Sequence, residues 1–314
     1  MMAKDLPVVT VNVFPGGFNW PIYVGQGKEF FAANSIAVQV QGTPDSVTQM
    51  TDFARGKFEI AMTAVDNIVA YVEGQGQAPI GPQPEFVACM GVDTGFLSLV
   101  AAPDIKTIQD LRGKILSVDA MTTGYAFVLY DILRRNGLEL EKGDYQLVSA
   151  GGMIQRWKGL NEGRHHATLL SAPYNLIAKT AGFSELVRAT DVIGPYQGNV
   201  AAARRSWAAS NPEKMIGYIR AYRQSVAWLY QPANRIEAID ILCRNLPNMP
   251  QDIAAASYDE LLHPIHGFFR DCELDRKGLG CVLELRNRYA PPPKPLGDPD
   301  RYYDPQYSIA ANIL

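Results

Sequence analysis

The chain has 314 residues, 47% of them hydrophobic and 19% charged, which permits a large core and argues against a disordered protein. Its 29 Lys and Arg residues against 32 Asp and Glu residues give a net charge of -3. No basic stripe stands out, so a nucleic-acid partner has little electrostatic support. No apolar run reaches the roughly 18 residues that a transmembrane helix needs, so we expect no membrane span, and the length favours two lobes.

The first two thirds of the chain alternate short apolar runs with helical patterns. Alternation of this kind predicts an α/β fold with mostly parallel sheets. Each apolar run has four to seven residues and is bounded by Gly, Pro, Asp or Ser, as is typical of buried strands. The predicted strands are Val8–Phe14, Ile36–Val40, Ile60–Thr63, Phe86–Gly91, Phe96–Ala101, Ile115–Val118, Tyr145–Ser149 and Ala167–Leu170.

The pattern changes after Ser206, where no convincing strand is found. Apolar residues at three- and four-residue spacing predict a long helix that ends near Tyr230. Further helices are expected at Arg235–Arg244, Gln251–Leu262 and Gly278–Arg288. The proline-rich segment that begins at Ala290 must be extended, and we expect it to wrap a surface as a strap.

A short internal echo supports two similar halves. The segments Gly42-Thr43-Pro44-Asp45 and Thr63-Ala64-Val65-Asp66-Asn67 flank a strand in the first half. Gly151-Gly152-Met153 and Ser171-Ala172-Pro173-Tyr174 stand in the same relation in the second half. The echo suggests two α/β lobes that face one another, although coincidence would also explain a match this short.

Candidate ligand-binding residues follow the ends of the predicted strands. In open parallel sheets, ligands bind beyond the carboxyl ends of the strands, where helix amino termini offer free N–H groups. The residues that this rule selects are Phe18, Asn19, Trp20, Thr63, Asp66, Asn67, Thr122, Thr123, Gly124, Tyr125, Ser171 and Tyr174.

Thr122, Thr123 and Gly124 are small hydrogen-bond donors at a predicted helix start. They suit a carboxylate, a sulfonate or a phosphate, although simple helix capping by threonine is an equal alternative. Asp66 and Asn67 would orient polar groups of the ligand. Arg156 is a candidate counter-charge, with an ordinary solvated position on a helix face as the alternative.

Aromatic residues recur at the same loops. Phe18, Trp20, Tyr125, Tyr174 and Tyr196 could stack on a flat ligand or wall its pocket. Core packing is the alternative for any one of them, and we expect two or three to contact ligand.

The four cysteines are too few for a disulfide scaffold and form no C-x-x-C pair. Cys272 and Cys281 lie close enough in sequence to bridge, or they are inert thiols. A zinc site built with His263 and His266 is disfavoured, because the spacing matches no known finger and a proline separates the two histidines. We expect neither a metal nor a cofactor.

Several segments resemble a known family. Thr107-Ile108-Gln109-Asp110-Leu111-Arg112-Gly113-Lys114-Ile115 is similar to a segment of type II periplasmic solute-binding proteins. Together with the Gly-Thr-Pro segment, the Gly-x-x-[DE]-x-A segment and Ser-Asn-Pro-Glu before a long helix, it resembles the nitrate/sulfonate/taurine branch of ABC-importer binding proteins. The resemblance covers roughly Val8 to Val226.

The resemblance implies two α/β lobes that close on a ligand by a hinge motion, and delivery of that ligand to an ABC-importer permease. Lobe one would comprise residues 1–97 and 200–314, and lobe two residues 98–199. The crossings would lie near residues 96–101 and 194–200. The ligand would be a small organic anion or a flat aromatic or heteroaromatic acid.

Two departures from the family pattern stand out. His165 and His166 stand where the family pattern has an acid. One interpretation is a neutral pair on the surface, and the other is that His166 contacts the ligand. The resemblance implies a periplasmic location, yet Met1 to Thr10 has no export signal, and a native start at Met1 or Met2 would imply a cytoplasmic one.

A non-catalytic binding protein is the favoured interpretation, without catalytic residues. The alternative is a cytosolic enzyme of the same fold, decarboxylase-like or related to pyrimidine precursors, that acts on a small aromatic acid. No catalytic motif supports that alternative, although a decarboxylase could work without one.

Overall fold

The computed structural model describes residues 6–246 and 248–312, whose strands form two five-stranded sheets. The first sheet has the order β2-β1-β3-β10-β4 and the second the order β7-β6-β8-β5-β9. The strands are Val8–Val13 (β1), Ala37–Gly42 (β2), Ile60–Ala64 (β3), Phe86–Gly91 (β4), Ser98–Ala101 (β5), Ile115–Val118 (β6), Gln146–Ser149 (β7), Ala167–Leu170 (β8), Ser184–Arg188 (β9) and Asn199–Arg204 (β10).

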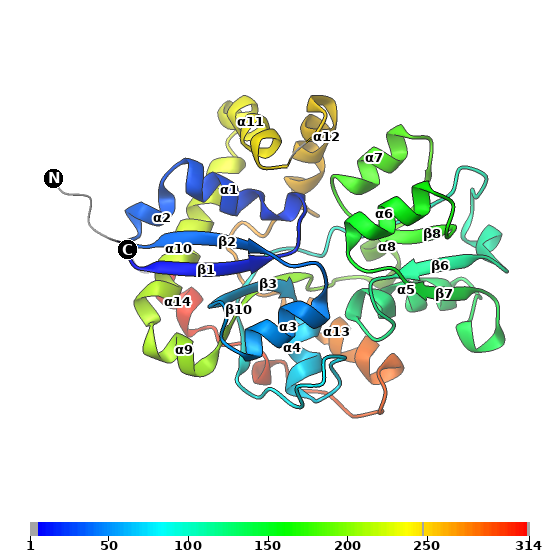
Figure 1. Ribbon diagram of the computed structural model, residues 1–314, viewed down its shortest axis with the longest axis horizontal. Helices are drawn as coiled ribbons and strands as arrows, with labels where there is room; N and C mark the ends of the chain where they lie inside the picture. The colour runs from blue at the N-terminus through cyan, green and yellow to red at the C-terminus, as the bar shows by residue number, and fades with distance from the viewer. Residues whose placement is uncertain (1–5, 247, 313–314) are drawn as a thin grey trace.

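Helices flank each sheet, so that the molecule consists of two α/β lobes side by side (Figure 1). The first lobe also carries the helices that follow β10. The α-helices are Trp20–Gly27 (α1), Phe30–Ala33 (α2), Ser46–Ala54 (α3), Val65–Val72 (α4), Gly124–Arg135 (α5), Met153–Asn161 (α6), Tyr174–Thr180 (α7), Ala189–Ile193 (α8), Arg205–Ser210 (α9), Pro212–Leu229 (α10), Arg235–Asn245 (α11), Gln251–Leu261 (α12), Arg276–Tyr289 (α13) and Gln306–Asn312 (α14).

Each sheet is mostly parallel, as expected, with four strands that run in one direction and one that is reversed. In the first sheet β1 runs parallel to β2 and β3, whereas β10 runs antiparallel to β3 and β4. In the second sheet β5 is antiparallel to β8 and β9 in the same way. The reason is that β5 and β10 are the strands by which the chain enters each sheet from the other lobe.

All eight predicted strands are present, and β9 and β10 are two that the sequence patterns did not reveal. β9 is a partly exposed edge strand with Glu185 and Arg188 among its five residues. β10 has three consecutive alanines, which have low strand propensity, and they adopt a strand because they are buried within the sheet. Both strands therefore lacked a sequence signal of their own.

Two short segments join the sheets: residues 92–97 between β4 and β5, and residues 194–198 between α8 and β10. They touch one another closely. A Cβ atom added to Gly198 would lie 2.0 Å from the backbone nitrogen of Gly95, which itself has a positive φ of 89°. Only glycine therefore fits where the two segments meet.

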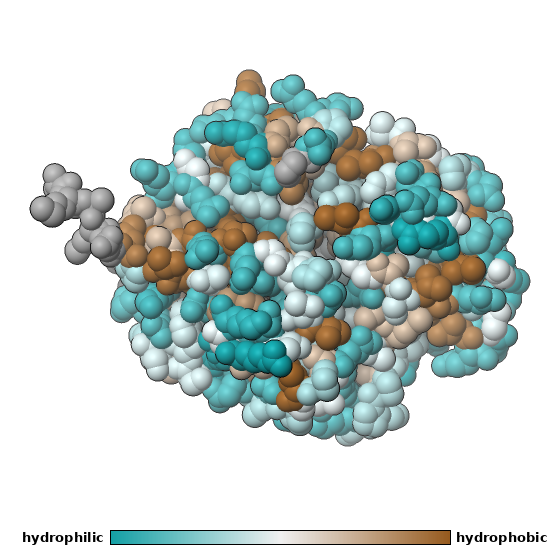
Figure 2. All heavy atoms as spheres, in the orientation of Figure 1, coloured by the Kyte–Doolittle hydropathy of each residue, from teal (hydrophilic) through white to brown (hydrophobic). Residues whose placement is uncertain are grey.

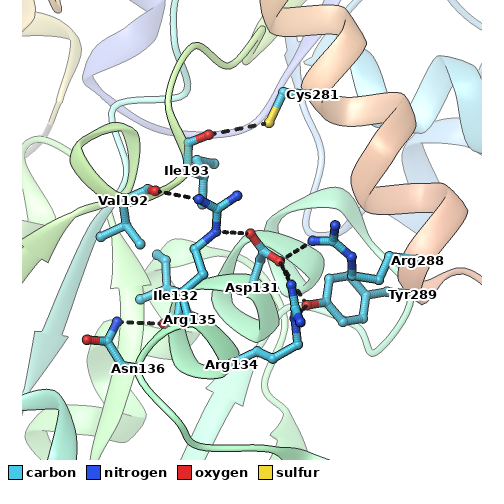
Figure 3. Close-up of polar contacts among 10 residues, drawn as sticks. All are labelled: Asp131, Ile132, Arg134, Arg135, Asn136, Val192, Ile193, Cys281, Arg288 and Tyr289. Carbon is cyan, nitrogen blue, oxygen red and sulfur yellow. Dashed lines mark hydrogen bonds and ion pairs between the residues drawn. The ribbon is translucent and has the colours of Figure 1, made fainter.

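Helix α13 of the first lobe packs against α5 of the second. Figure 3 shows Arg288 and Tyr289 of α13 pointing at the buried carboxylate of Asp131 on α5. Asp131 accepts hydrogen bonds from Arg288 Nη1 at 2.6 Å, Tyr289 Oη at 2.9 Å and Arg135 Nε at 2.6 Å. Burial opposes ionisation of Asp131, but these donors outweigh it and lower its pKa. The carboxylate therefore fastens the two lobes together beside the crossing segments.

A second buried ion pair fixes α13 to its own lobe. Arg286 donates from Nη1 to both carboxylate oxygens of Asp66 on α4, at 2.8 and 2.7 Å, and both side chains are almost fully buried. The guanidinium also lies 5.3 Å from the ring centroid of Phe127 on α5. α13 thus links α4 and α5 through charged groups as well as through apolar ones.

The segment after α13 crosses the first lobe as an extended strap. Its contacts converge on the buried carboxylate of Glu73, which accepts a hydrogen bond from Tyr302 Oη at 3.0 Å and pairs with Arg301 and Lys294. Burial opposes ionisation of Glu73, and these hydrogen bonds and charges nevertheless lower its pKa. The final helix α14 then packs against α10.

The surface mixes polar and apolar residues. On the face drawn in Figure 2, hydrophobic residues lie in scattered groups among hydrophilic ones. Within the described residues, no helix combines the length and the apolar character needed to cross a membrane.

We predict that Asp66→Asn lowers the free energy of unfolding by about 3–5 kcal/mol, because it leaves the buried Arg286 charge without its partner. The matched control is Asp300→Asn, which removes the partner of Arg276 in an exposed ion pair and should cost at most about 1 kcal/mol. Urea unfolding followed by circular dichroism measures both. Equal costs would contradict the prediction.

Candidate functional site

A cavity lies between the two sheets, with about 100 Å³ open to the centres of water-sized molecules, which is room for a small ligand. Residues of both lobes line it. They are Phe14, Pro15, Phe18, Thr43, Pro44, Ala64, Asn67 and Asn199 from the first lobe, and Asp119, Thr123, Gly124, Tyr125, Gly152, Met153, Ile154, Gln155 and Arg156 from the second.

The lining follows from the sheet topology. Phe14, Thr43 and Ala64 stand at or directly after the carboxyl ends of β1, β2 and β3, and Asp119 follows β6. Asn199 is the first residue of β10, which runs antiparallel to β3, so its amino end lies at the same edge. The cavity therefore occupies the position where α/β sheets bind ligands.

Arg156 on α6 supplies a buried positive charge to the cavity. Its Nη1 donates to the backbone oxygen of Leu169 at 2.6 Å, whereas its Nε has no hydrogen-bond partner. Among the described residues, Arg156 forms no ion pair. Burial lowers the pKa of Arg156, and the nearby charge of Asp119 acts in the opposite direction. A guanidinium in this state is prepared to receive an anion.

Asp119 places a carboxylate in the same cavity. Its Oδ1 accepts hydrogen bonds from the backbone nitrogen of Ala120 at 2.7 Å and from Thr123 Oγ1 at 2.6 Å. Its Oδ2 has only a long contact of 3.5 Å from Ser46 Oγ. Burial raises the pKa of Asp119, while the Arg156 charge and the Thr123 hydrogen bond oppose that shift. One carboxylate oxygen thus remains able to contact a ligand.

Two helices begin at the cavity wall. α5 starts at Gly124, and α6 starts at Met153 after Gly152. The first N–H groups of a helix lack partners within it, and they carry a partial positive charge. These helix starts add to the positive potential of Arg156 on the side of the second lobe.

Apolar side chains form the remaining walls. Phe14, Phe18 and Met153 line the cavity, and Tyr125 adds an aromatic ring whose buried hydroxyl has no hydrogen-bond partner among the described residues. Burial raises the pKa of Tyr125 well above its ordinary value, so it stays a neutral donor or acceptor. The cavity can therefore hold a ligand with an apolar body and polar ends.

Of the residues selected from the sequence, the structure brings together six at the cavity: Phe18, Asn67, Thr123, Gly124, Tyr125 and Arg156. Arg156 is buried rather than solvated, because α6 lays that face on β8. Thr123 also serves as the helix cap, since its Oγ1 accepts from the backbone nitrogen of Ala126 at 3.4 Å. Thr123 is therefore both a helix cap and a lining residue, and its contact with ligand stays a prediction.

The other selected residues do not line the cavity, and their ligand roles stay predictions. They are Asn19, Trp20, Thr63, Asp66, Thr122, Ser171, Tyr174, Tyr196 and His166. Asn19, Thr63, Ser171 and Tyr196 are among those that contact its lining residues. Thr63 Oγ1 accepts from Asn67 at 2.8 Å, Ser171 Oγ lies 3.1 Å from Met153 Sδ, and the Tyr196 ring packs 6.4 Å from that of Tyr125.

Several of these residues have structural partners instead. Trp20 is fully buried, donates from Nε1 to the backbone oxygen of Ala238 at 3.0 Å and meets the ring of Tyr258 edge-on. Asn19 donates from Nδ2 to Phe14 O at 2.6 Å, which shapes the loop after β1. Thr122 accepts from Gln77 Nε2 at 2.9 Å near the surface.

The two adjacent histidines have different environments. His165 is buried, not a surface residue as expected, and its Nε2 lies 3.0 Å from both the Arg156 backbone oxygen and Ser117 Oγ. Burial lowers the pKa of His165 to about 4, so the ring is neutral near pH 7. His166 is partly exposed, and its Nδ1 lies 3.3 Å from the backbone of Ile115. His165 thus contacts the backbone carbonyl of Arg156, the residue whose side chain lines the cavity.

The cysteines and the other two histidines lie away from the cavity. Cys272 and Cys281 are both free thiols in the structure, and His263 stacks on His266 with ring centroids 5.0 Å apart. Among the described residues, no group of three or more His, Cys, Asp or Glu side chains could hold a metal ion.

Asp119 and Asn199 are two of the polar lining residues that were not selected from the sequence, together with Thr43 and Gln155. Asp119 follows a correctly predicted strand, so the rule of strand ends could have selected it together with Thr123. Asn199 had no such signal, because β10 itself was not predicted.

Comparisons with known proteins agree with the fold. The family model described as NMT1/THI5 like matches residues 19–235. Comparison of the sequence with curated proteins gives no match.

Solved structures share the fold at low sequence identity. The periplasmic aliphatic sulphonate binding protein SsuA from Escherichia coli is 16% identical with a TM-score of 0.72, over 95% of this chain and 92% of that one. The periplasmic nitrate-binding protein NrtA from Synechocystis PCC 6803 is 13% identical with a TM-score of 0.75, over 99% and 86%. The zinc-bound ligand-binding component of an ABC-type import system from Staphylococcus aureus is 12% identical with a TM-score of 0.76, over 97% and 99%.

We predict that His165 makes the protein less stable in mild acid. Its pKa is about 4 when folded and about 6.5 when unfolded, so the unfolded state takes up the proton first as the pH falls. The free energy of unfolding should therefore fall by at most about 3 kcal/mol between pH 6.5 and pH 4 on account of this group. Denaturant unfolding at several pH values should show that His165→Gln loses this part of the pH dependence, whereas the control His166→Gln keeps it.

Proposed function

Since the chain belongs to the NMT1/THI5-like family, we propose that it is a solute-binding protein that captures a small organic anion between its lobes. The observation that carries the proposal is Arg156, a buried guanidinium at the cavity wall with an unpartnered Nε and no ion pair among the described residues. A buried charge without a partner is costly, and an anionic ligand would relieve that cost.

The ligand's acidic group meets Arg156 and the first turns of α5 and α6, where helix N–H groups favour negative charge. The ligand's body lies against Phe14, Phe18 and Tyr125, which suits a flat aromatic or heteroaromatic acid.

The ligand passes from this protein to the permease of an ABC importer, which places the protein in the periplasm. The support is the likeness in fold to sulphonate- and nitrate-binding periplasmic proteins and to a component of an import system. Each of these is described as a binding component, so the comparisons favour binding over the alternative of an enzyme on the same fold.

Binding closes two lobes, residues 1–97 with 199–314 and residues 98–198, about the joining segments 92–97 and 194–198. These segments lie close to the crossings expected near 96–101 and 194–200, but residues 98–101 form β5 and Asn199 begins β10. The division is supported by the two sheets, since β1 to β4 and β10 belong to one sheet and β5 to β9 belong to the other. A ligand held by both lobes would stabilise the closed state by its differential affinity for that state.

We predict that Arg156→Met weakens anion binding about ten- to hundredfold, because it removes a charge-assisted hydrogen bond in a buried site. Thermal-shift screening of benzoate, benzenesulfonate, nicotinate and nitrate would supply the probe, and calorimetry would measure its affinity. Arg156→Lys, which keeps the charge but not the planar fork, should fall between the two.

The matched control is Arg164→Met, since Arg164 is largely exposed and pairs with Glu162 outside the cavity. Circular dichroism of the ligand-free variants separates loss of folding from loss of binding. Unchanged affinity in a folded Arg156→Met protein would refute the role of this arginine, and mass spectrometry that finds a chemically altered probe would favour an enzyme.

A further inference from the structure

Asp93 joins the two crossing segments through its buried carboxylate and through its backbone oxygen. Oδ1 of the carboxylate accepts from the backbone nitrogens of Gly95 at 2.7 Å and Asn199 at 3.0 Å. The backbone oxygen of Asp93 accepts from the backbone nitrogen of Gly198 at 2.8 Å. Asp93 is fully buried, so these bonds have no competition from water.

The same carboxylate holds the side chain of Asn199. Asn199 Nδ2 donates to Asp93 Oδ2 at 2.9 Å and to Oδ1 at 3.2 Å. A carboxylate only accepts hydrogen bonds, so it must face the amino end of the amide. Asn199 Oδ1 is thereby left over, and it accepts no hydrogen bond from the described part of the chain. Since Asn199 lines the cavity, Oδ1 is its polar atom available to a ligand.

We propose that Asp93 is a positioning residue that fixes Asn199 as a hydrogen-bond acceptor for the ligand. The proposal rests on the proposed function and deepens it. The ligand then carries an N–H or O–H donor at the end that meets Asn199, beside the acidic group that meets Arg156. Selection of the ligand is thereby tied to the clamp that joins the two crossing segments.

The geometry predicts that Asp93→Asn changes the group that Asn199 presents to the cavity, rather than only removing hydrogen bonds. The new amide can keep its oxygen on the backbone nitrogens of Gly95 and Asn199, where two donors converge. Its amino group then takes the place of Oδ2 and faces Asn199 Nδ2, so that two donors meet. The Asn199 amide must rotate, presenting Oδ1 to position 93 and Nδ2 to the cavity. The acceptor in the cavity becomes a donor.

The first test needs no ligand. Nuclear magnetic resonance of the isotopically labelled protein measures hydrogen exchange of the Asn199 side-chain amide. In the wild type this group is bonded to Asp93 and buried, and in Asp93→Asn we expect exchange to rise by about tenfold or more because the group turns to the cavity. An Asn199 amide that stays equally protected in a folded Asp93→Asn protein would overturn the proposal.

The second test uses pyrrole-2-carboxylate and furan-2-carboxylate, which share their shape and acidic group but differ in a ring N–H against a ring oxygen. Calorimetry gives the ratio of their affinities. Asp93→Asn should shift this ratio toward the furan by about ten- to hundredfold. Equal weakening of both probes would mean that Asp93 is merely structural and would overturn the proposal.

Two further variants complete the design. In the double variant Asp93→Asn with Asn199→Asp, the amide and the carboxylate exchange places, so the cavity regains an acceptor and the wild-type ratio should return. Asp131→Asn is the control, because it also neutralises a buried aspartate but lies away from the cavity. It should reduce stability and leave the ratio unchanged. If neither probe binds the wild type, the proposed ligand class fails, and the exchange measurement still decides the role of Asp93.

Discussion

The contact between the two crossing segments is the constraint on which the site depends. Each segment is only a few residues long, and Gly95 and Gly198 let them meet without side chains between them. The chain therefore enters each sheet against the direction of its parallel strands, as β5 and β10. This arrangement points the carboxyl edges of both sheets at one shared cavity, and it puts the first residue of β10 in the cavity wall.

Buried charges divide into two groups by whether the protein satisfies them. Asp131, Glu73 and the Asp66–Arg286 pair have partners within the chain and tie α13 and the strap to the rest of the molecule. Arg156 and one oxygen of Asp119 face the cavity without strong partners. Unsatisfied polar groups cost stability, and they are retained where a ligand is to complete them.

A net charge of -3 gives the protein no broad positive field for anions. In the proposed function, an anion would therefore be recognised locally, through one guanidinium and two helix starts inside a low-dielectric cavity. Asn199 and Asp119 add acceptor atoms to the same space, so the lining combines hydrogen-bond acceptors with the positive charge of Arg156. His165 behind Arg156 is kept neutral by burial and thus adds no competing charge near pH 7.

The sequence by itself determined the α/β class, the positions of eight strands and the helical segments after Ser206, because hydrophobic periodicity and turn residues act locally. It also selected Phe18, Asn67 and Thr123, which follow the ends of strands and line the cavity between the lobes. The tertiary structure alone decided the one reversed strand in each sheet and the burial of Arg156 and His165. It also decided that Asp66 pairs with Arg286 and that Trp20 donates to the Ala238 carbonyl, so that neither lines the cavity. These outcomes depend on which segments meet in the folded chain, across as many as 220 positions for Asp66 and Arg286, and local patterns carry no information on such meetings.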